Sequence, residues 1–149
     1  MTLPTAREAI KFGERDPDIY LAEKQGRLMP QDPVERQRAM EYLFLQAASV
    51  GPMFGQAGWF LRAAPQPLPL AIERYRGESL RLTRLLNERL QETPWLAGSE
   101  YSLADIMHFP WLRIADYAGI DLAQFSAVAD WVARIAARPA VQRALARLQ

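Results

Sequence analysis

The chain of 149 residues contains no cysteine and a single histidine, His108. The absence of cysteine excludes disulfide bonds, thiolate metal sites and a cysteine nucleophile, and it is typical of a protein kept in the cytosol. One histidine is too few for the usual zinc ligand sets. We therefore expect a cytoplasmic protein that binds no metal.

An excess of charge of one sign is also lacking. The chain has 18 basic and 17 acidic residues, mixed along its length, for a formal net charge of +1. Without a basic stripe, nucleic acid is not an expected partner. The most apolar stretch, residues 42–61, is interrupted by Pro52, glycines and glutamines and is followed by Arg62, so we interpret it as a buried helix. No secretory signal pattern is found, and no membrane partner is expected.

No run of strand length alternates apolar and polar residues, while good helix formers dominate, so we expect an all-α domain. Residues 1–18 combine prolines and a glycine with charges and should form a loosely ordered tail, and residues 19–149 should form the helical domain. The expected helices are 19–26, 33–64, 70–91, one beginning at Ser102, and two more separated by Pro139. Pro52 predicts a kink in the long second helix between Val50 and Met53.

The segment from Tyr101 to Ile106 has the pattern of a helix start. Ser102 can accept the amide of Asp105 while the Asp105 carboxylate accepts the amide of Ser102, and Tyr101 can pack on Ile106. A serine and an aspartate near His108 could suggest a hydrolase triad, but the chain has no Gly-x-Ser-x-Gly nucleophile elbow. We interpret Ser102 and Asp105 as a structural capping box and His108 as structural, and we expect no catalytic residue.

Five short blocks, spread along the expected domain, are informative together. They are Tyr20–Lys24 (YLAEK), Ser49–Gln56 (SVGPMFGQ), Ala71–Tyr75 (AIERY), Trp95–Gly98 before the capping box, and Ile135–Gln142 (IAARPAVQ). In this order they resemble the C-terminal helical domain of glutathione transferases, most closely the bacterial Nu class, whose members reduce disulfides with glutathione. The resemblance implies a helical bundle that closes the substrate cleft and takes part in dimerisation. The thioredoxin-like N-terminal domain that grips glutathione in this family is expected to be absent.

The resemblance also raises an expectation about activity. The family carries a Glu-Ser pair where this chain has Gly13 and Glu14, and a glutamate would repel the γ-glutamyl carboxylate of glutathione. We therefore expect weak or absent glutathione binding and no turnover by the chain alone, although the intact family performs glutathione transfer or disulfide reduction. The alternative function is a non-enzymatic interaction module of the same fold. Two origins of the tail stay open: a frameshift near Asp18, or a short protein with a new N-terminus.

By resemblance, Arg74 contacts glutathione, where a guanidinium can hold a carboxylate in a bidentate pair. The alternative is an exposed arginine paired with Glu73, Glu78 or solvent. The resemblance further implies that four aromatic side chains wall an apolar substrate pocket, with core or interface packing as the alternative. These four are Phe54, Trp59, Phe60 and Trp111.

Gly51, Gly55 and Gly58 form a small-residue face on the long helix. By resemblance this face lies near the subunit interface and the floor of the cleft, and dense core packing is the equally simple alternative. Absence of the partner domain should expose an apolar patch along the faces carrying Tyr20, Trp111 and these glycines. We therefore expect self-association, most simply as a homo-oligomer.

Overall fold

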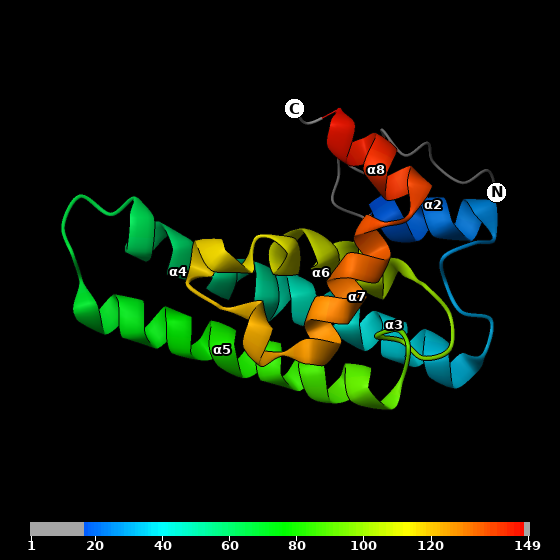
Figure 1. The fold of residues 1–149 in the computed structure, drawn as a ribbon. Helices are drawn as coiled ribbons and strands as arrows, with labels where there is room; N and C mark the ends of the chain where they lie inside the picture. Colours follow the sequence, from blue (N-terminus) through cyan, green and yellow to red (C-terminus); the bar gives the residue numbers. More distant parts are fainter. Residues whose placement is uncertain (1–16, 148–149) are drawn as a thin grey trace.

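Helices make up all the regular structure of residues 17–147, the part of the chain that the computed structural model describes (Figure 1). In chain order they are α2 (Pro17–Gln25), α3 (Pro33–Leu45), the π-helical turn η1 (Gln46–Val50), α4 (Gly51–Arg62), α5 (Pro69–Glu92), α6 (Leu103–Arg113), the 3-10 helices η2 (Ala115–Ala118) and η3 (Leu122–Gln124), α7 (Ser126–Ala136) and α8 (Pro139–Ala146). The expected all-α class is confirmed for these residues. Most of the predicted N-terminal tail lies outside them.

The predicted long helix, residues 33–64, is a continuous helical run with one irregularity. It begins as expected, because the Asp32 side chain accepts the backbone N–H groups of Val34 and Glu35. The π-helical turn η1 ends two residues before Pro52. Since proline has no N–H to donate, the regular bonding pattern must change close to it. An irregularity therefore lies next to Pro52, slightly earlier than the interval predicted for the kink, and the kink itself stays a prediction.

α5 extends along one side of the bundle and returns beside α4 (Figure 1). Its inner face buries Ser79, Leu82, Thr83 and Leu86. The two buried hydroxyl groups are satisfied within the helix, because Ser79 donates to the carbonyl of Tyr75 and Thr83 donates to the carbonyl of Ser79. α5 can therefore bury polar side chains against the core without leaving their hydrogen bonds unmade.

α6 lies at the centre of the bundle, and the predicted capping box forms at its start. The Asp105 carboxylate accepts the backbone N–H of Ser102 at 3.0 Å and its hydroxyl at 3.2 Å. It also accepts the backbone N–H of Leu96 at 3.0 Å and the indole Nε1–H of Trp131 at 2.8 Å. One fully buried carboxylate thus joins the loop before α6, the first turn of α6, and α7.

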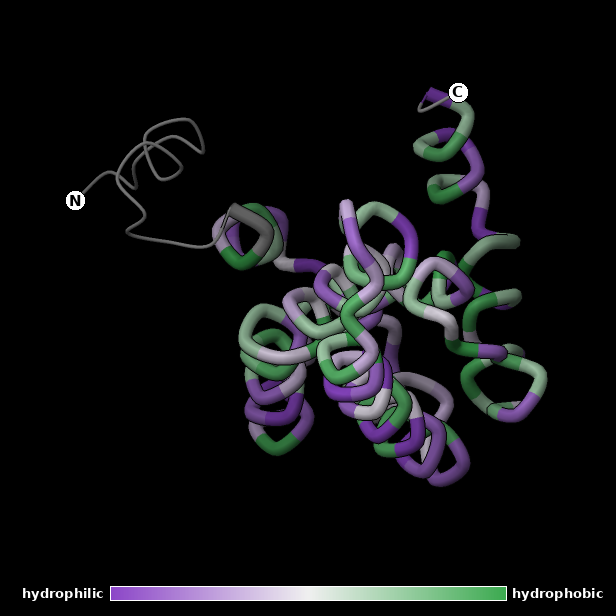
Figure 2. Tube along the Cα trace, turned by 90° about the vertical axis from the view of Figure 1, so that its left-hand side faces the viewer, coloured by the Kyte–Doolittle hydropathy of each residue, from purple (hydrophilic) through white to green (hydrophobic). Residues whose placement is uncertain are grey.

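The first and last helices of the described chain, α2 and α8, differ in how much they are buried. Tyr20 on α2 is only 3% exposed, so the predicted apolar patch at this residue is wrong. The side chain is buried although it lies close to the edge of the expected domain. At the other end, α8 has no buried residue and projects from the bundle (Figure 2).

Within residues 17–147, no helix has the length and apolar character needed to cross a membrane. No group of three or more His, Asp or Glu side chains in this range is arranged to hold a metal ion.

Replacement of Asp105 should destabilise the fold more than loss of an ordinary helix cap. Asp105→Ala leaves several buried donors without an acceptor, and we expect it to lower the free energy of unfolding by about 3–5 kcal/mol. The matched control is Asp32→Ala, which removes an exposed cap and should cost about 1 kcal/mol. Chemical denaturation of both variants measures the difference. Equal losses would show that the bonds to Leu96 and Trp131 contribute nothing.

Candidate functional site

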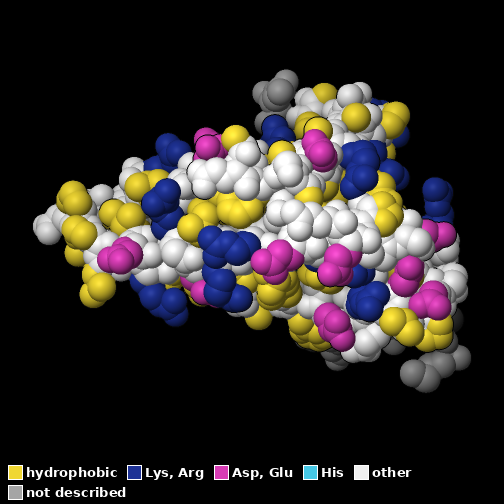
Figure 3. All heavy atoms as spheres, turned by 60° about the horizontal axis from the view of Figure 1, so that its bottom comes forward, with side chains coloured by type: hydrophobic (Ala, Val, Ile, Leu, Met, Phe, Trp, Pro, Cys, Tyr) yellow, Lys and Arg dark blue, Asp and Glu magenta, His cyan; other side chains and the backbone are white. Residues whose placement is uncertain are grey.

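Aromatic side chains link the end of α4 to the start of α5. The ring of Phe60 stacks on that of Tyr75, with centroids 5.3 Å apart and planes 8° from parallel. The Trp59 ring meets Phe60 edge-on at 4.8 Å and is 43% exposed, whereas Phe54 is 1% exposed within the core. Hydrophobic side chains gather at this end of the molecule (Figure 3). The large exposed ones around the α4–α5 connection are Leu61, Leu68 and Leu70.

Arg74 precedes the stacked Tyr75 on α5 and is exposed. Within the described residues, its guanidinium makes no hydrogen bond or ion pair. Glu78 accepts two hydrogen bonds from Arg81, at 3.0 and 2.7 Å, and these bonds lower the pKa of its carboxyl, which the charge of Arg74 also helps to lower. The exposure of Arg74 to solvent also fits the alternative of a solvated helix arginine. Arg74 therefore keeps its donors available for an external anion.

Two other arginines of this hairpin are already engaged. Arg62 donates to two backbone carbonyls of η2, and Arg76 donates to the carbonyl of Gly119 at 3.0 Å. These carbonyl groups lie at the C-terminal end of a short helix, where the last carbonyl groups have no N–H donor within the helix. Arg62 and Arg76 therefore act as structural caps, which distinguishes them from Arg74.

The glycine face of α4 is covered by aromatic rings of the same chain. Trp111 packs on Gly51 and Gly55, where an added Cβ would lie 3.3 and 3.5 Å from the indole. The Tyr117 ring lies directly on Gly58, so that a Cβ there would overlap it. The observed packing agrees with the dense-packing alternative. It also rules out an exposed patch on the glycine face, because Trp111 and Tyr117 occupy it.

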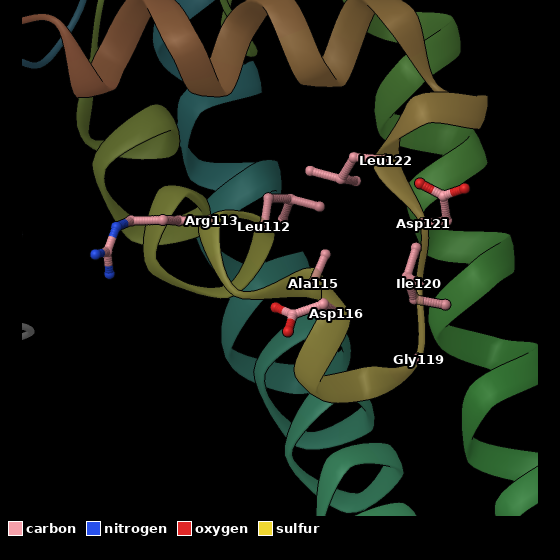
Figure 4. Close-up of a pocket in the computed structure, with 8 residues that line it drawn as sticks. All are labelled: Leu112, Arg113, Ala115, Asp116, Gly119, Ile120, Asp121 and Leu122. Carbon is pink, nitrogen blue, oxygen red and sulfur yellow. The ribbon is translucent and has the colours of Figure 1, made fainter.

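A hollow of about 430 Å³ lies beside η2 (Figure 4). It is lined by Leu112, Arg113, Ala115, Asp116, Gly119, Ile120, Asp121 and Leu122. None of the four aromatic residues predicted for a substrate pocket lines it. No pattern in the sequence indicates this hollow, because the end of α6, the 3-10 helix η2 and the segment up to η3 are too short to show a helical period. The substrate role of the four aromatic residues thus stays a prediction.

His108 is fully buried in α6. Its Nδ1 lies 2.8 Å from the carbonyl oxygen of Ala104, which requires Nδ1 to carry the hydrogen, while Nε2 has no partner. Burial lowers the pKa of the imidazole to about 4. The Tyr42 ring packs against it in a T-shaped arrangement, with ring centroids 5.9 Å apart. This environment supports the structural interpretation, because a buried neutral imidazole without solvent access cannot exchange protons with a substrate.

Comparison with known proteins identifies relatives for most of the chain. A family model described as the C-terminal domain of glutathione S-transferase matches residues 52–139. The disulfide-bond oxidoreductase YfcG of Escherichia coli (strain K12) is 46% identical over 131 residues, which cover 88% of this chain and 61% of YfcG. An uncharacterised GST-like protein of Streptococcus mutans is 36% identical, over 93% of this chain and 56% of its own length.

Solved structures of glutathione transferases match the fold. One from Burkholderia graminis, with two glutathione molecules bound per subunit, has a TM-score of 0.80 and 40% identity, and the match covers 85% of this chain and 56% of that one. One from Pseudomonas putida, with one glutathione disulfide bound per subunit, has a TM-score of 0.79, 40% identity and coverages of 85% and 58%. The chain therefore spans less than two thirds of the length of these relatives.

The stability of the protein should depend on pH through His108. Its pKa of about 4 in the folded protein lies below the value of about 6.5 in an unfolded chain, so stability is full above pH 6.5 and is lost as the pH falls towards 4. Between pH 7 and pH 4.5 we expect a loss of about 2–3 kcal/mol. Urea denaturation at both values, on the parent and on His108→Leu, measures it.

The comparison isolates His108 because the other titrating groups are common to both proteins. Burial raises the pKa of Asp105, so its protonation changes stability in the opposite direction, and by the same amount in parent and variant. His108→Leu should therefore lose less stability in acid than the parent. An identical acid dependence in the two proteins would contradict the prediction.

Proposed function

The chain belongs to the glutathione S-transferase family and is of its bacterial Nu-like type, and from this we propose that its helices form the substrate-side half of a glutathione-dependent site. The reaction of that site is disulfide reduction or glutathione transfer, as the names of the relatives indicate for those proteins. The cytosol, where thiols stay reduced, is the location that suits such a reaction. Because the chain covers only part of each relative, the activity of a whole protein is part of this proposal.

Arg74 is the residue proposed to contact glutathione. The observation that carries the proposal is its exposed guanidinium without a protein partner, beside the stacked pair of Phe60 and Tyr75. Glutathione and its disulfide carry carboxylates, and the planar fork of an arginine matches a carboxylate in two parallel hydrogen bonds. Trp59 and Phe60 then provide the apolar wall on the α4 side, and Phe54 and Trp111 support it from within the bundle.

Residues 1–149 alone are proposed to be inactive. Disulfide reduction requires a thiolate, and a thiol near pKa 8.5 needs a neighbouring base or cation to form one at neutral pH. The chain has no cysteine of its own, and its single histidine is fully buried with a pKa of about 4. The helical half therefore offers a carboxylate contact at Arg74 and an apolar wall, but its single histidine cannot act as the base that activates the thiol.

Binding of glutathione disulfide should be weak and should depend on Arg74. Calorimetric titration at constant ionic strength should show Arg74→Ala binding about tenfold more weakly than the parent, since a charge-assisted hydrogen bond is worth that much. Arg84→Ala is the matched control, an exposed arginine of the same helix, and should bind like the parent. Turnover with glutathione should be absent in all three. Equal binding by both variants, or turnover by the parent, would contradict the proposal.

A second copy of the chain is the partner we propose. Exposed residues recur at intervals of three and four along the α3–α4 run and so share one side of it. They are Phe44, Ala48, Pro52, Gln56 and Trp59. Phe44 is 68% exposed, and an exposed stripe with this apolar content is typical of a protein interface. A non-enzymatic interaction module, the alternative function, would use the same stripe.

Self-association should therefore respond to Phe44. We expect the parent chain to run as a dimer in size-exclusion chromatography with light scattering, and Phe44→Lys to shift it towards monomer, because a buried unpaired lysine would oppose association. Leu70→Lys is the control, since Leu70 is 82% exposed but lies at the α4–α5 connection. A monomeric parent, or equal effects of the two substitutions, would contradict this assignment. Dimerisation without any binding of glutathione disulfide would favour the interaction module.

A further inference from the structure

A second hollow, of about 320 Å³, lies where the linker after α2 meets the residues that precede α6 and α8. It is lined by Gly26, Arg27, Leu28, Met29, Gln31, Glu100, Tyr101 and Arg138. This volume is at the small end of the range for small-molecule sites, which is roughly 300–1,000 Å³. Neither Arg74 nor the aromatic residues of the α4–α5 hairpin lines this hollow, so it is distinct from the site proposed above.

The linker wall of the hollow is fixed in position by backbone hydrogen bonds. The backbone N–H of Arg27 donates to the carbonyl of Ala22 at 3.1 Å, and the carbonyl of Leu28 accepts from Leu103 at the start of α6, at 2.9 Å. Between these bonds the chain turns through left-handed backbone angles at Gly26 (φ 59°) and Leu28 (φ 68°). A leucine rarely adopts such an angle, so the turn is held by its surroundings. Arg27 is therefore presented from a defined turn.

A second arginine of the lining, Arg138, is held by stacking on an aromatic ring. The guanidinium carbon of Arg138 lies 3.8 Å from the centroid of the Tyr101 ring. The Tyr101 ring in turn meets the Trp95 ring edge-on, with centroids 5.1 Å apart. The guanidinium carbon of Arg134 lies 4.5 Å from the centroid of the Trp95 ring. Stacking fixes the plane of the Arg138 guanidinium and leaves its N–H donors without a hydrogen-bond acceptor among the described residues.

The hollow therefore has an excess of positive charge and of donors. Arg27 and Arg138 line the hollow together with a single carboxylate, that of Glu100, and neither arginine forms an ion pair within the described part of the chain. Burial raises the pKa of Tyr101, so its hydroxyl stays protonated at neutral pH and keeps a hydrogen to donate. Gln31 adds an amide. Two guanidinium groups, together with neutral hydroxyl and amide donors, match a small anion that carries about two negative charges.

We propose that this hollow binds a phosphate-type dianion, either inorganic phosphate or the phosphate group of a small ester, between Arg27 and Arg138. A dianion can satisfy both guanidinium groups at once, whereas a single carboxylate can neutralise only one. Glu100 lies at the hollow and repels anions, so binding requires both arginines to outweigh it.

The first test is calorimetric titration with inorganic phosphate, glycerol 3-phosphate and acetate at constant ionic strength, which keeps charge screening the same for all three ligands. Saturable binding of phosphate, at least tenfold tighter than acetate, is the expected result. Tighter binding of glycerol 3-phosphate than of phosphate would identify an ester as the ligand class, and the reverse order would identify the free ion. The absence of saturable binding by either phosphate compound, or equal binding of acetate, would overturn the proposal.

The second test uses variants of the two arginines. Arg27→Gln and Arg138→Gln should each weaken phosphate binding about tenfold, the value of one charge-assisted hydrogen bond. Arg84→Gln and Arg74→Ala are controls and should leave it unchanged, which separates this site from the proposed glutathione contact. Arg27 is exposed, so its variant remains informative even if loss of the Arg138 stack disturbs folding. Unchanged phosphate binding in Arg27→Gln would overturn the proposal.

Discussion

The buried carboxylate of Asp105 is the interaction on which the rest of the structure depends. Burial makes its charge costly and raises its pKa, and the four hydrogen bonds that it accepts offset that cost. Because the donors come from the Leu96 loop, the start of α6, and Trp131 of α7, one side chain fixes three segments. Tyr101, whose ring stacks on the guanidinium of Arg138, directly precedes Ser102 of this network in the sequence.

Local signals in the sequence predicted the helices and their starts. Asp32 before a proline, and Ser102 followed three residues later by Asp105, are patterns whose hydrogen bonds close within one turn. The bond from Trp131 to the same aspartate joins residues 26 positions apart, and no local pattern encodes it. The burial of Tyr20 is also a tertiary effect, and the prediction that it is exposed was wrong because it was based on the family arrangement alone.

The candidate site was predictable only in part. Sequence patterns indicated that Gly51, Gly55 and Gly58 permit close packing, but not that rings from α6 and η2 would cover them. Arg74 was selected by resemblance, and the structure adds that its neighbour Glu78 is engaged by Arg81. The two hollows gave no sequence signal. The hollow beside η2 is lined by residues that lie close together in the chain, within 112–122. In the second hollow, Arg27, Glu100 and Arg138 are far apart in the chain, and only the folded structure brings them together.

The separation of roles among the arginines of α5 follows from helix geometry. Arg74 and Arg76 are two residues apart, which places them about 200° apart around the helix axis. Since Arg76 reaches the carbonyl of Gly119 beside η2, Arg74 must face away from η2. The hollow beside η2 and the guanidinium of Arg74 therefore lie on different sides of α5. A carboxylate bound by Arg74 therefore lies on the opposite side of α5 from the hollow beside η2. Arg74 and this hollow cannot form one binding site.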